Sequence, residues 1–118
     1  MPFNPGDIVS LDFLIPSTGK YLTHSAVILS TVDVYNHERT YVCAMMSSYN
    51  VNDRFTFKLE NSMLQNASNK ECSQVRSHLI TYVPDTKVRP ANGTPYNRLS
   101  QHAFERLISH IDEVVFGV

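Results

Sequence analysis

Two short apolar segments near the N-terminus, residues 6–13 and 24–30, constrain the fold most strongly. Apolar and polar residues are interleaved in the first segment, and the second contains a continuous apolar run, residues 26–29, bounded by serines. Both patterns are typical of β-strands. The residues between them include 16–20, Pro-Ser-Thr-Gly-Lys, which favour a turn. We therefore predict two strands that pair with each other across a long exposed loop.

The middle of the chain contains further strand patterns. Residues 31–35 and 40–46 are rich in β-branched and aromatic side chains, and the polar residues 36–39 between them predict a hairpin. Large apolar and polar residues alternate in 55–59, as in a strand with one buried face. A further strand is predicted over 73–83, which ends at a Pro-Asp pair.

The C-terminal part of the chain predicts a single amphipathic helix. Residues 60–71 are mostly polar and predict an irregular segment, and 88–97 predict a connector because prolines and an Asn-Gly pair interrupt them. Ser100 is the predicted N-cap and Gly117 the predicted left-handed C-cap. Apolar residues recur between them at helical spacing: Phe104, Leu107, Ile108, Ile111, Val114 and Val115. The order of elements predicts a mainly β fold, a bent antiparallel sheet or small barrel with a C-terminal helix over its open side.

Composition narrows the class of protein. A chain of 118 residues with 42% hydrophobic residues predicts one domain, 1–118. The net charge of -1 argues against a broadly basic nucleic-acid-binding surface, so an RNA site would be a local groove. Cys43 and Cys72 lie far apart and predict inert thiols in a cytoplasmic protein. The first residues lack the pattern of a signal peptide, and no apolar run is long enough for a membrane span.

The two N-terminal segments carry a family resemblance. Gly-Asp-Ile-Val at 6–9 and His-Ser-Ala-Val-Ile-Leu-Ser at 24–30 resemble the start of the MazF/PemK (Kid) family, whose second strand reads Arg-Pro-Ala-Val-Ile-Ser. His24 and Ser25 stand where that family has Arg-Pro. The resemblance implies a CcdB/MazF/PemK-like fold, an SH3-like small β-barrel with a C-terminal helix. It also implies a metal-independent endoribonuclease toxin that cleaves single-stranded RNA, a homodimer, and an antitoxin protein that occupies the RNA groove.

The resemblance extends to two later segments. Residues 41–48 are similar to the family strand that ends in Pro-Ile-Thr-Ser, so Ser47 takes the place of an active-site Thr. Residues 75–81 are similar to the strand with Asp-Gln-Ile-Arg-Thr, in either of two registers. Anchoring on Thr81 aligns Ser77 with the Asp and His78 with the Gln, whereas anchoring on Arg76 aligns His78 with a catalytic Asp of Kid-type members. Neither register places an acidic residue there.

Cleavage of RNA by its own 2'-hydroxyl requires a base, an acid for the leaving 5'-oxygen, and donors for the phosphorane. Histidine suits the first two roles because its unperturbed pKa is about 6.5, and arginine suits phosphate through its planar donors. We therefore take His24 and His78 as candidate acid and base, Arg76 as a phosphate ligand and Ser47 as a hydrogen-bond donor. Arg76 and His78 are two apart in a predicted strand, so they point to the same side.

Candidate RNA contacts beyond these are Lys20 and Thr18 in the first loop and Ser48. The less specific interpretation treats His24 as a strand-edge residue, Arg76 as part of a solvated face, and Ser47 and Ser48 as the end of a strand. No metal site or cofactor is expected, because His102 and His110 are eight residues apart and no Cys/His spacing typical of zinc occurs.

A second class of function stays open at this point. The family's Arg is missing at His24, and no acidic residue occurs at 77 or 78. These departures are also consistent with a non-catalytic barrel, either a protein-binding module or a gyrase-poison-like toxin such as the related CcdB branch of the fold.

Overall fold

The computed structural model describes residues 2–48, 51–67 and 73–118. Within these residues one antiparallel sheet has the strand order β4-β5-β3-β2-β1-β6. Its strands are β1 (Asp7–Ile15), β2 (Lys20–Ile28), β3 (Thr40–Ser47), β4 (Thr56–Lys58), β5 (Gln74–Pro84) and β6 (Asn97–Arg98). The remaining elements are the helices α1 (Val32–Glu38) and α2 (Gln101–Ile111), the 3-10 turns η1 (Asn61–Met63) and η2 (Asp85–Lys87), and the π-helical turn η3 (Asp112–Phe116).

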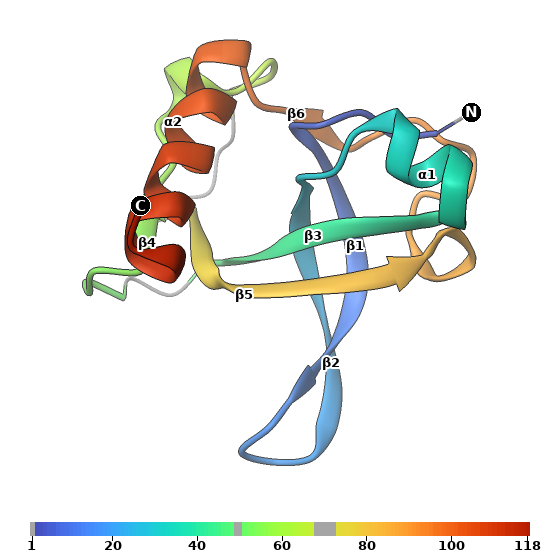
Figure 1. Ribbon diagram of the computed structural model, residues 1–118, viewed down its shortest axis with the longest axis horizontal. Helices are drawn as coiled ribbons and strands as arrows, with labels where there is room; N and C mark the ends of the chain where they lie inside the picture. The colour runs from blue at the N-terminus through green and yellow to red at the C-terminus, as the bar shows by residue number, and fades with distance from the viewer. Residues whose placement is uncertain (1, 49–50, 68–72) are drawn as a thin grey trace.

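The sheet bends into an incomplete barrel. In Figure 1 the β1–β2 hairpin extends away from the rest of the molecule, and α2 lies at the opposite end of β5 from α1. Within the described residues β1 and β5 do not pair with each other, so the barrel stays open between them. The predicted fold class, mainly β with a C-terminal helix, is confirmed, and the barrel is not closed.

Apolar side chains pack on both faces of the sheet. On the inner face, β1 contributes Val9, Leu11 and Phe13 to a cluster that also contains Ala26, Ile28, Tyr41, Cys43 and Met45. The second cluster lies under α2, whose buried residues Ala103, Leu107 and Ile111 pack with Ile8, Val27, Ala44, Phe57 and Val75. Neighbouring residues of one strand enter opposite clusters, as the alternation of side chains requires.

The predicted C-terminal helix is confirmed, including its ends. The Ser100 hydroxyl accepts a hydrogen bond from the Ala103 backbone N–H at 3.1 Å, which is an N-cap. At the other end Gly117 has φ +72°, the left-handed conformation in which a side chain is strained. Between them the helix changes from α to π geometry at Asp112.

The predicted hairpin over 31–35 and 40–46 is wrong in its first strand. Residues Val32–Glu38 form α1, and the polar residues expected to form the turn are its last turn, closed by Arg39 at φ 55°. Tertiary contacts favour the helix over the β propensity of its valines. The Tyr35 ring stacks on Tyr41 at 5.2 Å between ring centroids, and its hydroxyl donates to the Asp85 carboxylate at 3.2 Å.

The other predicted segments agree with the structure with small differences. The predicted strands 6–13, 24–30, 55–59 and 73–83 correspond to β1, β2, β4 and β5. The long loop predicted between the first two is wrong, because β1 continues to Ile15 and pairs with β2 from Lys20 on, which leaves only the turn 16–19. In the segment 60–71, the described residues 60–67 contain the turn η1 and an isolated bridge from Leu64 to Leu99, and residues 68–71 lie outside the described part of the chain. The connector 88–97 is irregular until Asn97, where β6 begins, although Arg89 forms an isolated bridge with Ser10. Cys43 is buried, and Cys72 lies outside the described residues.

Candidate functional site

The first candidate site is a cavity where β2 and β3 separate. These strands pair only from Ala26 to Ile28, opposite Cys43 to Met45, so the earlier half of β2 diverges from the end of β3. A cavity of about 420 Å³ lies there. Its lining is mostly polar and uncharged, and contains Ile8, Ser10, Thr23, His24, Ser25, Met46, Ser47, Ser48, Leu64, Ser73, Tyr96 and Asn97. Three of the predicted site residues, His24, Ser47 and Ser48, therefore line one cavity.

His24 lies on β2 opposite Leu11 of β1. Its ring is half-buried and meets the Phe13 ring edge-on, with 6.3 Å between ring centroids. The packing against Phe13 fixes the ring at the border of the inner apolar cluster, so His24 has both a packing role and a position on the cavity.

Ser47 and Ser48 end β3. Ser47 is half-buried and lies opposite Gln74 of β5, whereas Ser48 is exposed. The ladder between β3 and β5 is irregular between Ala44 and Met46, where the register shifts. Four residues of β5, 76–79, stand there opposite Met45 alone, so the extra residues of this bulge lie on β5.

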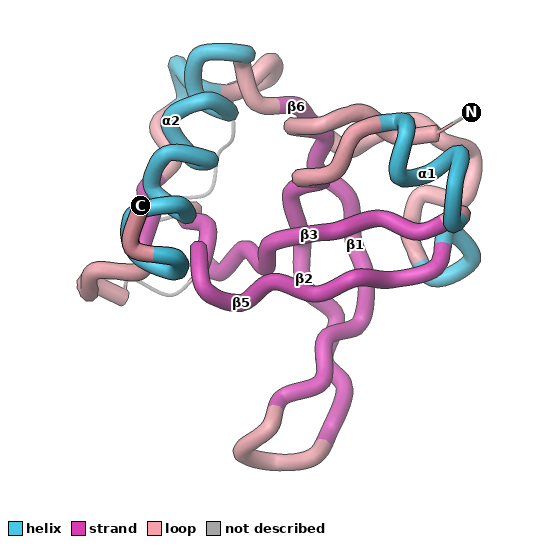
Figure 2. The backbone as a smooth tube through the Cα atoms, in the orientation of Figure 1, coloured by secondary structure: helices cyan, strands magenta, loops and turns pink. Residues whose placement is uncertain are grey.

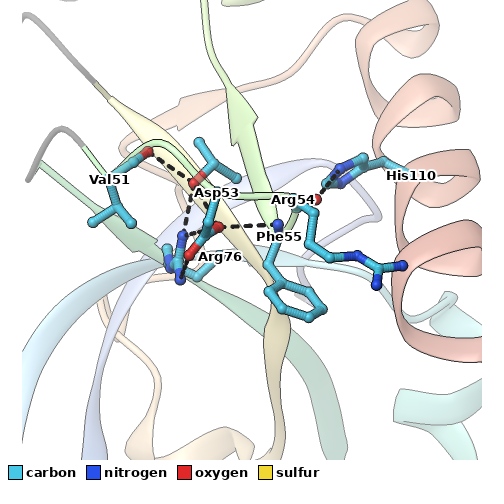
Figure 3. A network of polar contacts seen from close by, with 7 residues as sticks. Val51, Asp53, Arg54, Phe55, Arg76 and His110 are labelled. Carbon is cyan, nitrogen blue, oxygen red and sulfur yellow. Dashed lines mark hydrogen bonds and ion pairs between the residues drawn. The ribbon is translucent and has the colours of Figure 1, made fainter.

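Arg76 lies on β5 and is held by a second group of residues, shown in Figure 3. Its Nη1 and Nη2 donate to the two carboxylate oxygens of Asp53 at 3.0 and 2.9 Å, a bidentate ion pair. Its Nη1 also donates to the Thr56 hydroxyl at 2.7 Å. The Arg76 side chain is only 12% exposed. The guanidinium is thus already bound by the chain's own carboxylate.

The Asp53 carboxylate is well supplied with donors. Besides Arg76 it accepts from the Phe55 backbone N–H at 3.0 Å and from the Thr56 hydroxyl at 3.2 Å. The hydrogen bonds from Arg76 are the main cause that lowers the pKa of Asp53 to about 2. Asp53 is therefore ionised throughout the physiological pH range.

His78 follows Arg76 by two residues and lies at the edge of a second cavity. This cavity, of about 870 Å³, separates the β1–β2 hairpin from the outer part of β5. The His78 ring is exposed and lies 4.5 Å from the Phe55 ring between centroids. Partial desolvation lowers the pKa of His78, and the positive charge of Arg76 lowers it further. The neutral imidazole, a proton acceptor, is thereby favoured.

The residues of the first loop lie at the tip of the projecting hairpin, which Figure 2 shows as a loop between two strands. The Thr18 hydroxyl lies 3.4 Å from the Ile15 carbonyl and accepts from the Lys20 backbone N–H at 3.2 Å, so it stabilises the turn. Lys20 is exposed. Neither Thr18 nor Lys20 lines the 420 Å³ cavity.

The predicted site residues thus fall into three groups. His24, Ser47 and Ser48 share one cavity, Arg76 is paired with Asp53 beside His78 on β5, and Lys20 and Thr18 lie on the hairpin tip. Sequence reasoning missed Asp53, Thr56 and His110. Asp53 and Thr56 are three residues apart, a spacing typical of a local turn. Their contacts with Arg76 cannot be seen in that spacing, because they depend on the pairing of Thr56 in β4 with Arg76 in β5.

His110 joins α2 to β5 and to residue 54. Its Nδ1 lies 2.7 Å from the Ser77 hydroxyl, and its Nε2 lies 3.0 Å from the Arg54 carbonyl oxygen. Because a carbonyl only accepts, Nε2 carries the hydrogen, and Nδ1 of the neutral ring accepts from Ser77. A serine bonded to a histidine resembles an activated nucleophile, but Ser77 has no exposed surface and cannot reach a substrate. The contact is therefore an anchor between elements.

Among residues 2–48, 51–67 and 73–118, no three His, Cys, Asp or Glu side chains gather closely enough to hold a metal ion. In the same part of the chain, no helix combines the length and apolar character required to cross a bilayer.

The fold is shared with several solved structures. MazF from Deinococcus radiodurans (Form-I) superposes with a TM-score of 0.73 and 12% identity over 98% of each chain. An endoribonuclease in complex with its cognate antitoxin from a mycobacterial species gives a TM-score of 0.71 and 10% identity, over 98% of this chain and 96% of that one. The MazE-MazF complex of D. radiodurans (Form-III) gives 0.70 and 11%, over 98% and 97%. At these identities the likeness concerns the fold.

The sequence itself settles the family. The profile described as PemK-like, MazF-like toxin of type II toxin-antitoxin system matches residues 4–115. The chain therefore belongs to the PemK/MazF toxin family. A comparison with curated proteins found no match.

Proposed function

We propose that this chain is a toxin that cleaves single-stranded RNA without a metal ion. The observation that carries the proposal is the cavity lined jointly by His24 and Ser47, in a chain whose family match spans residues 4–115. The preference for single strands follows from RNA geometry, because unpaired bases present edges that an A-form helix hides.

The cleavage step uses the substrate's own 2'-hydroxyl. A base removes its proton, the 2'-oxygen attacks phosphorus, and the bond from phosphorus to the 5'-oxygen breaks as an acid protonates that oxygen. His24, which lines the cavity with Ser47, suits the acid. His78, whose neutral form suits a base, lines the separate 870 Å³ cavity, so it can act only where the RNA strand bridges the two cavities. Ser47 and Ser48 supply hydroxyl donors to the phosphorane oxygens, and Arg76 supplies the positive charge. The RNA strand would then pass from the cavity to β5, with Lys20 and Thr18 contacting a neighbouring part of it.

The expected partners extend this proposal. Two of the similar structures are toxin–antitoxin complexes, one of a MazF with MazE and one of an endoribonuclease with its cognate antitoxin. By that likeness we propose that an antitoxin protein inhibits this chain. We also propose that residues 1–118 form one domain, that the active form is a homodimer, and that it acts in the cytoplasm. Sedimentation should give twice the chain mass of 13.4 kDa at micromolar concentration. A monomer mass would contradict the dimer.

The test of the enzyme is cleavage of a long single-stranded RNA in EDTA by purified, antitoxin-free protein. The wild type should produce fragments, and His24→Ala and Ser47→Ala should each reduce the rate by roughly 100-fold or more, the usual contribution of an acid–base or oxyanion group. His102→Ala is the matched control, because His102 is an exposed histidine on α2. Absence of fragments with the wild type from pH 5 to 9 would refute the proposal.

A non-catalytic toxin is the second candidate, favoured by one observation. The Arg76 guanidinium is bound by Asp53, so its charge is neutralised locally. A barrel of this kind would act by binding a protein, as a gyrase poison does. Growth arrest that persists after His24 and His78 are both replaced by Ala would support this candidate, and loss of arrest in a folded double variant would contradict it.

A further inference from the structure

Three consecutive residues, 53–55, contact the two candidate residues of β5; we refer to them as the 53–55 segment. The Asp53 carboxylate binds the Arg76 guanidinium, and the Phe55 ring lies 4.5 Å from the His78 ring. Both contacts involve side chains that the proposed reaction requires. A single segment therefore contacts both β5 residues: it covers the Arg76 guanidinium, whereas the His78 ring stays exposed.

The 53–55 segment is itself fixed to the body of the protein. The Arg54 carbonyl accepts from His110 Nε2 on α2, and the Phe55 carbonyl accepts from the Ser77 backbone N–H at 2.9 Å. Figure 3 shows the Arg54 carbonyl facing His110 on one side and Asp53 facing Arg76 on the other. The middle of the segment is anchored, whereas the Asp53 end depends on the ion pair and on contacts with Thr56.

Arg76 and Thr56 form a group suited to an oxyanion. The two guanidinium nitrogens present parallel N–H donors. The Thr56 hydroxyl accepts from Nη1 at 2.7 Å, and its hydrogen faces two acceptors, the Val51 carbonyl at 2.9 Å and the Asp53 carboxylate at 3.2 Å. A carboxylate and a phosphodiester both offer two oxygens at a spacing that this arrangement binds. The ligand class of this group is therefore an oxyanion, and in this structure Asp53 supplies it.

We propose that Asp53 competes with RNA from within the protein. Its carboxylate occupies the site on Arg76 and Thr56 where a substrate phosphodiester binds. This inference rests on the proposed function for the identity of the phosphate. RNA must displace Asp53 to reach Arg76, so the affinity of the toxin for RNA is set below the affinity of the bare site. Because Asp53 stays ionised at neutral pH, the competition is permanent and is relieved only by movement of its end of the segment.

The test uses binding, separate from cleavage. The probe is a fluorescent single-stranded 2'-O-methyl oligoribonucleotide, which has no free 2'-hydroxyl and cannot be cleaved by this chemistry. Asp53→Asn should bind it roughly tenfold more tightly than the wild type in an anisotropy titration at fixed salt, because a charged competitor is removed while the turn to Phe55 is retained. Asp33→Asn, which makes the same charge change at an exposed carboxylate of α1, should change affinity by no more than about twofold, the effect of net charge alone.

A second substitution in the Asp53→Asn protein tests whether the gain in RNA affinity arises at Arg76. In Asp53→Asn, the further change Arg76→Gln should remove the whole gain, since the competitor and the probe share that residue. Asp53→Ser, whose hydroxyl still accepts from the Phe55 N–H, gives a second reading if the Asn variant does not fold.

The outcomes separate this inference from the proposed function. Equal affinity of wild type, Asp53→Asn and Asp53→Ser for the probe would overturn the competitor, as would an equal gain in Asp33→Asn. Tighter binding by the Asp53 variants, together with failure of every variant to cleave ordinary RNA, would support the competitor and contradict the enzyme.

Discussion

The hydrogen bond between Ser77 and His110 predicts that the effect of Ser77→Ala on stability changes sign when His110 is also replaced. Ser77 has no exposed surface, and its hydroxyl donates to His110 Nδ1 at 2.7 Å. Within the described residues, no buried side-chain nitrogen or oxygen lacks a partner. Replacing His110 by Leu removes the acceptor and leaves the buried Ser77 hydroxyl without one.

The expected cost follows from the burial of that hydroxyl. A buried polar group that loses its partner costs about 1–3 kcal/mol, whereas the Arg54 carbonyl, which also loses a donor, is near the surface and can bind water. For a domain of this size, that corresponds to a fall in Tm of roughly 4–12 °C. Ser77→Ala alone should cost less, about 1 kcal/mol, because the half-buried His110 ring can be reached by water.

The decisive comparison is Ser77→Ala in the two backgrounds. In the wild type it removes a hydrogen bond and should destabilise the protein, while in His110→Leu it removes an unsatisfied hydroxyl and should be neutral or stabilising. The coupling free energy should therefore be about 1–2 kcal/mol. Urea unfolding of the four proteins, followed by circular dichroism, measures it. If Ser77→Ala costs the same in both backgrounds, the hydroxyl does not depend on His110 and the reasoning is refuted.

Three further predictions concern other contacts. Ser100→Ala removes the N-cap of α2 and should lower the free energy of unfolding by about 0.5–2 kcal/mol in urea titrations, while Ser100→Thr should lose less. The contact with Arg76 lowers the pKa of Asp53 to about 2, so the pair stabilises the fold fully above about pH 4 and loses this effect as pH falls to 2. The urea midpoint of the wild type should therefore exceed that of Asp53→Asn at pH 7 and approach it at pH 2. A difference that stays constant with pH would contradict the pairing. Burial raises the pKa of the Cys43 thiol to about 12, so in a Cys72→Ser background it should react with a thiol reagent only after unfolding, and fast reaction of the native protein would contradict its burial.

The fold was predictable where the pattern is local. Alternation along β1 and β4 reflects the two faces of one sheet, and the stripe on α2 with caps at Ser100 and Gly117 reflects one helix on that sheet. The segment of α1 was mispredicted because Val32 and Val34 favour a strand, whereas the contact of Tyr35 with Tyr41 that favours the helix is not visible in the sequence around it.

The site was predictable only in part for a similar reason. Two-residue spacing in a strand predicts that Arg76 and His78 lie on the same side of β5, and the charge of Arg76 does lower the pKa of His78. The ion pair of Arg76 with Asp53 joins residues 23 apart, and the bond of Ser77 with His110 joins residues 33 apart. Such contacts depend on how β4 and α2 meet β5, which no local pattern contains.

The central claim is that this chain breaks RNA by attack of the 2'-hydroxyl, with His24 and Ser47 at the scissile phosphate. The most direct measurement is the chemistry of the fragment ends, determined by mass spectrometry after incubation of single-stranded RNA in EDTA. The expected fragments carry a 5'-hydroxyl and a 2',3'-cyclic phosphate, and His24→Ala should form them roughly 100-fold or more slowly. Fragments with a 5'-phosphate and a 3'-hydroxyl, or RNA left intact by both the wild type and Asp53→Asn, would contradict it.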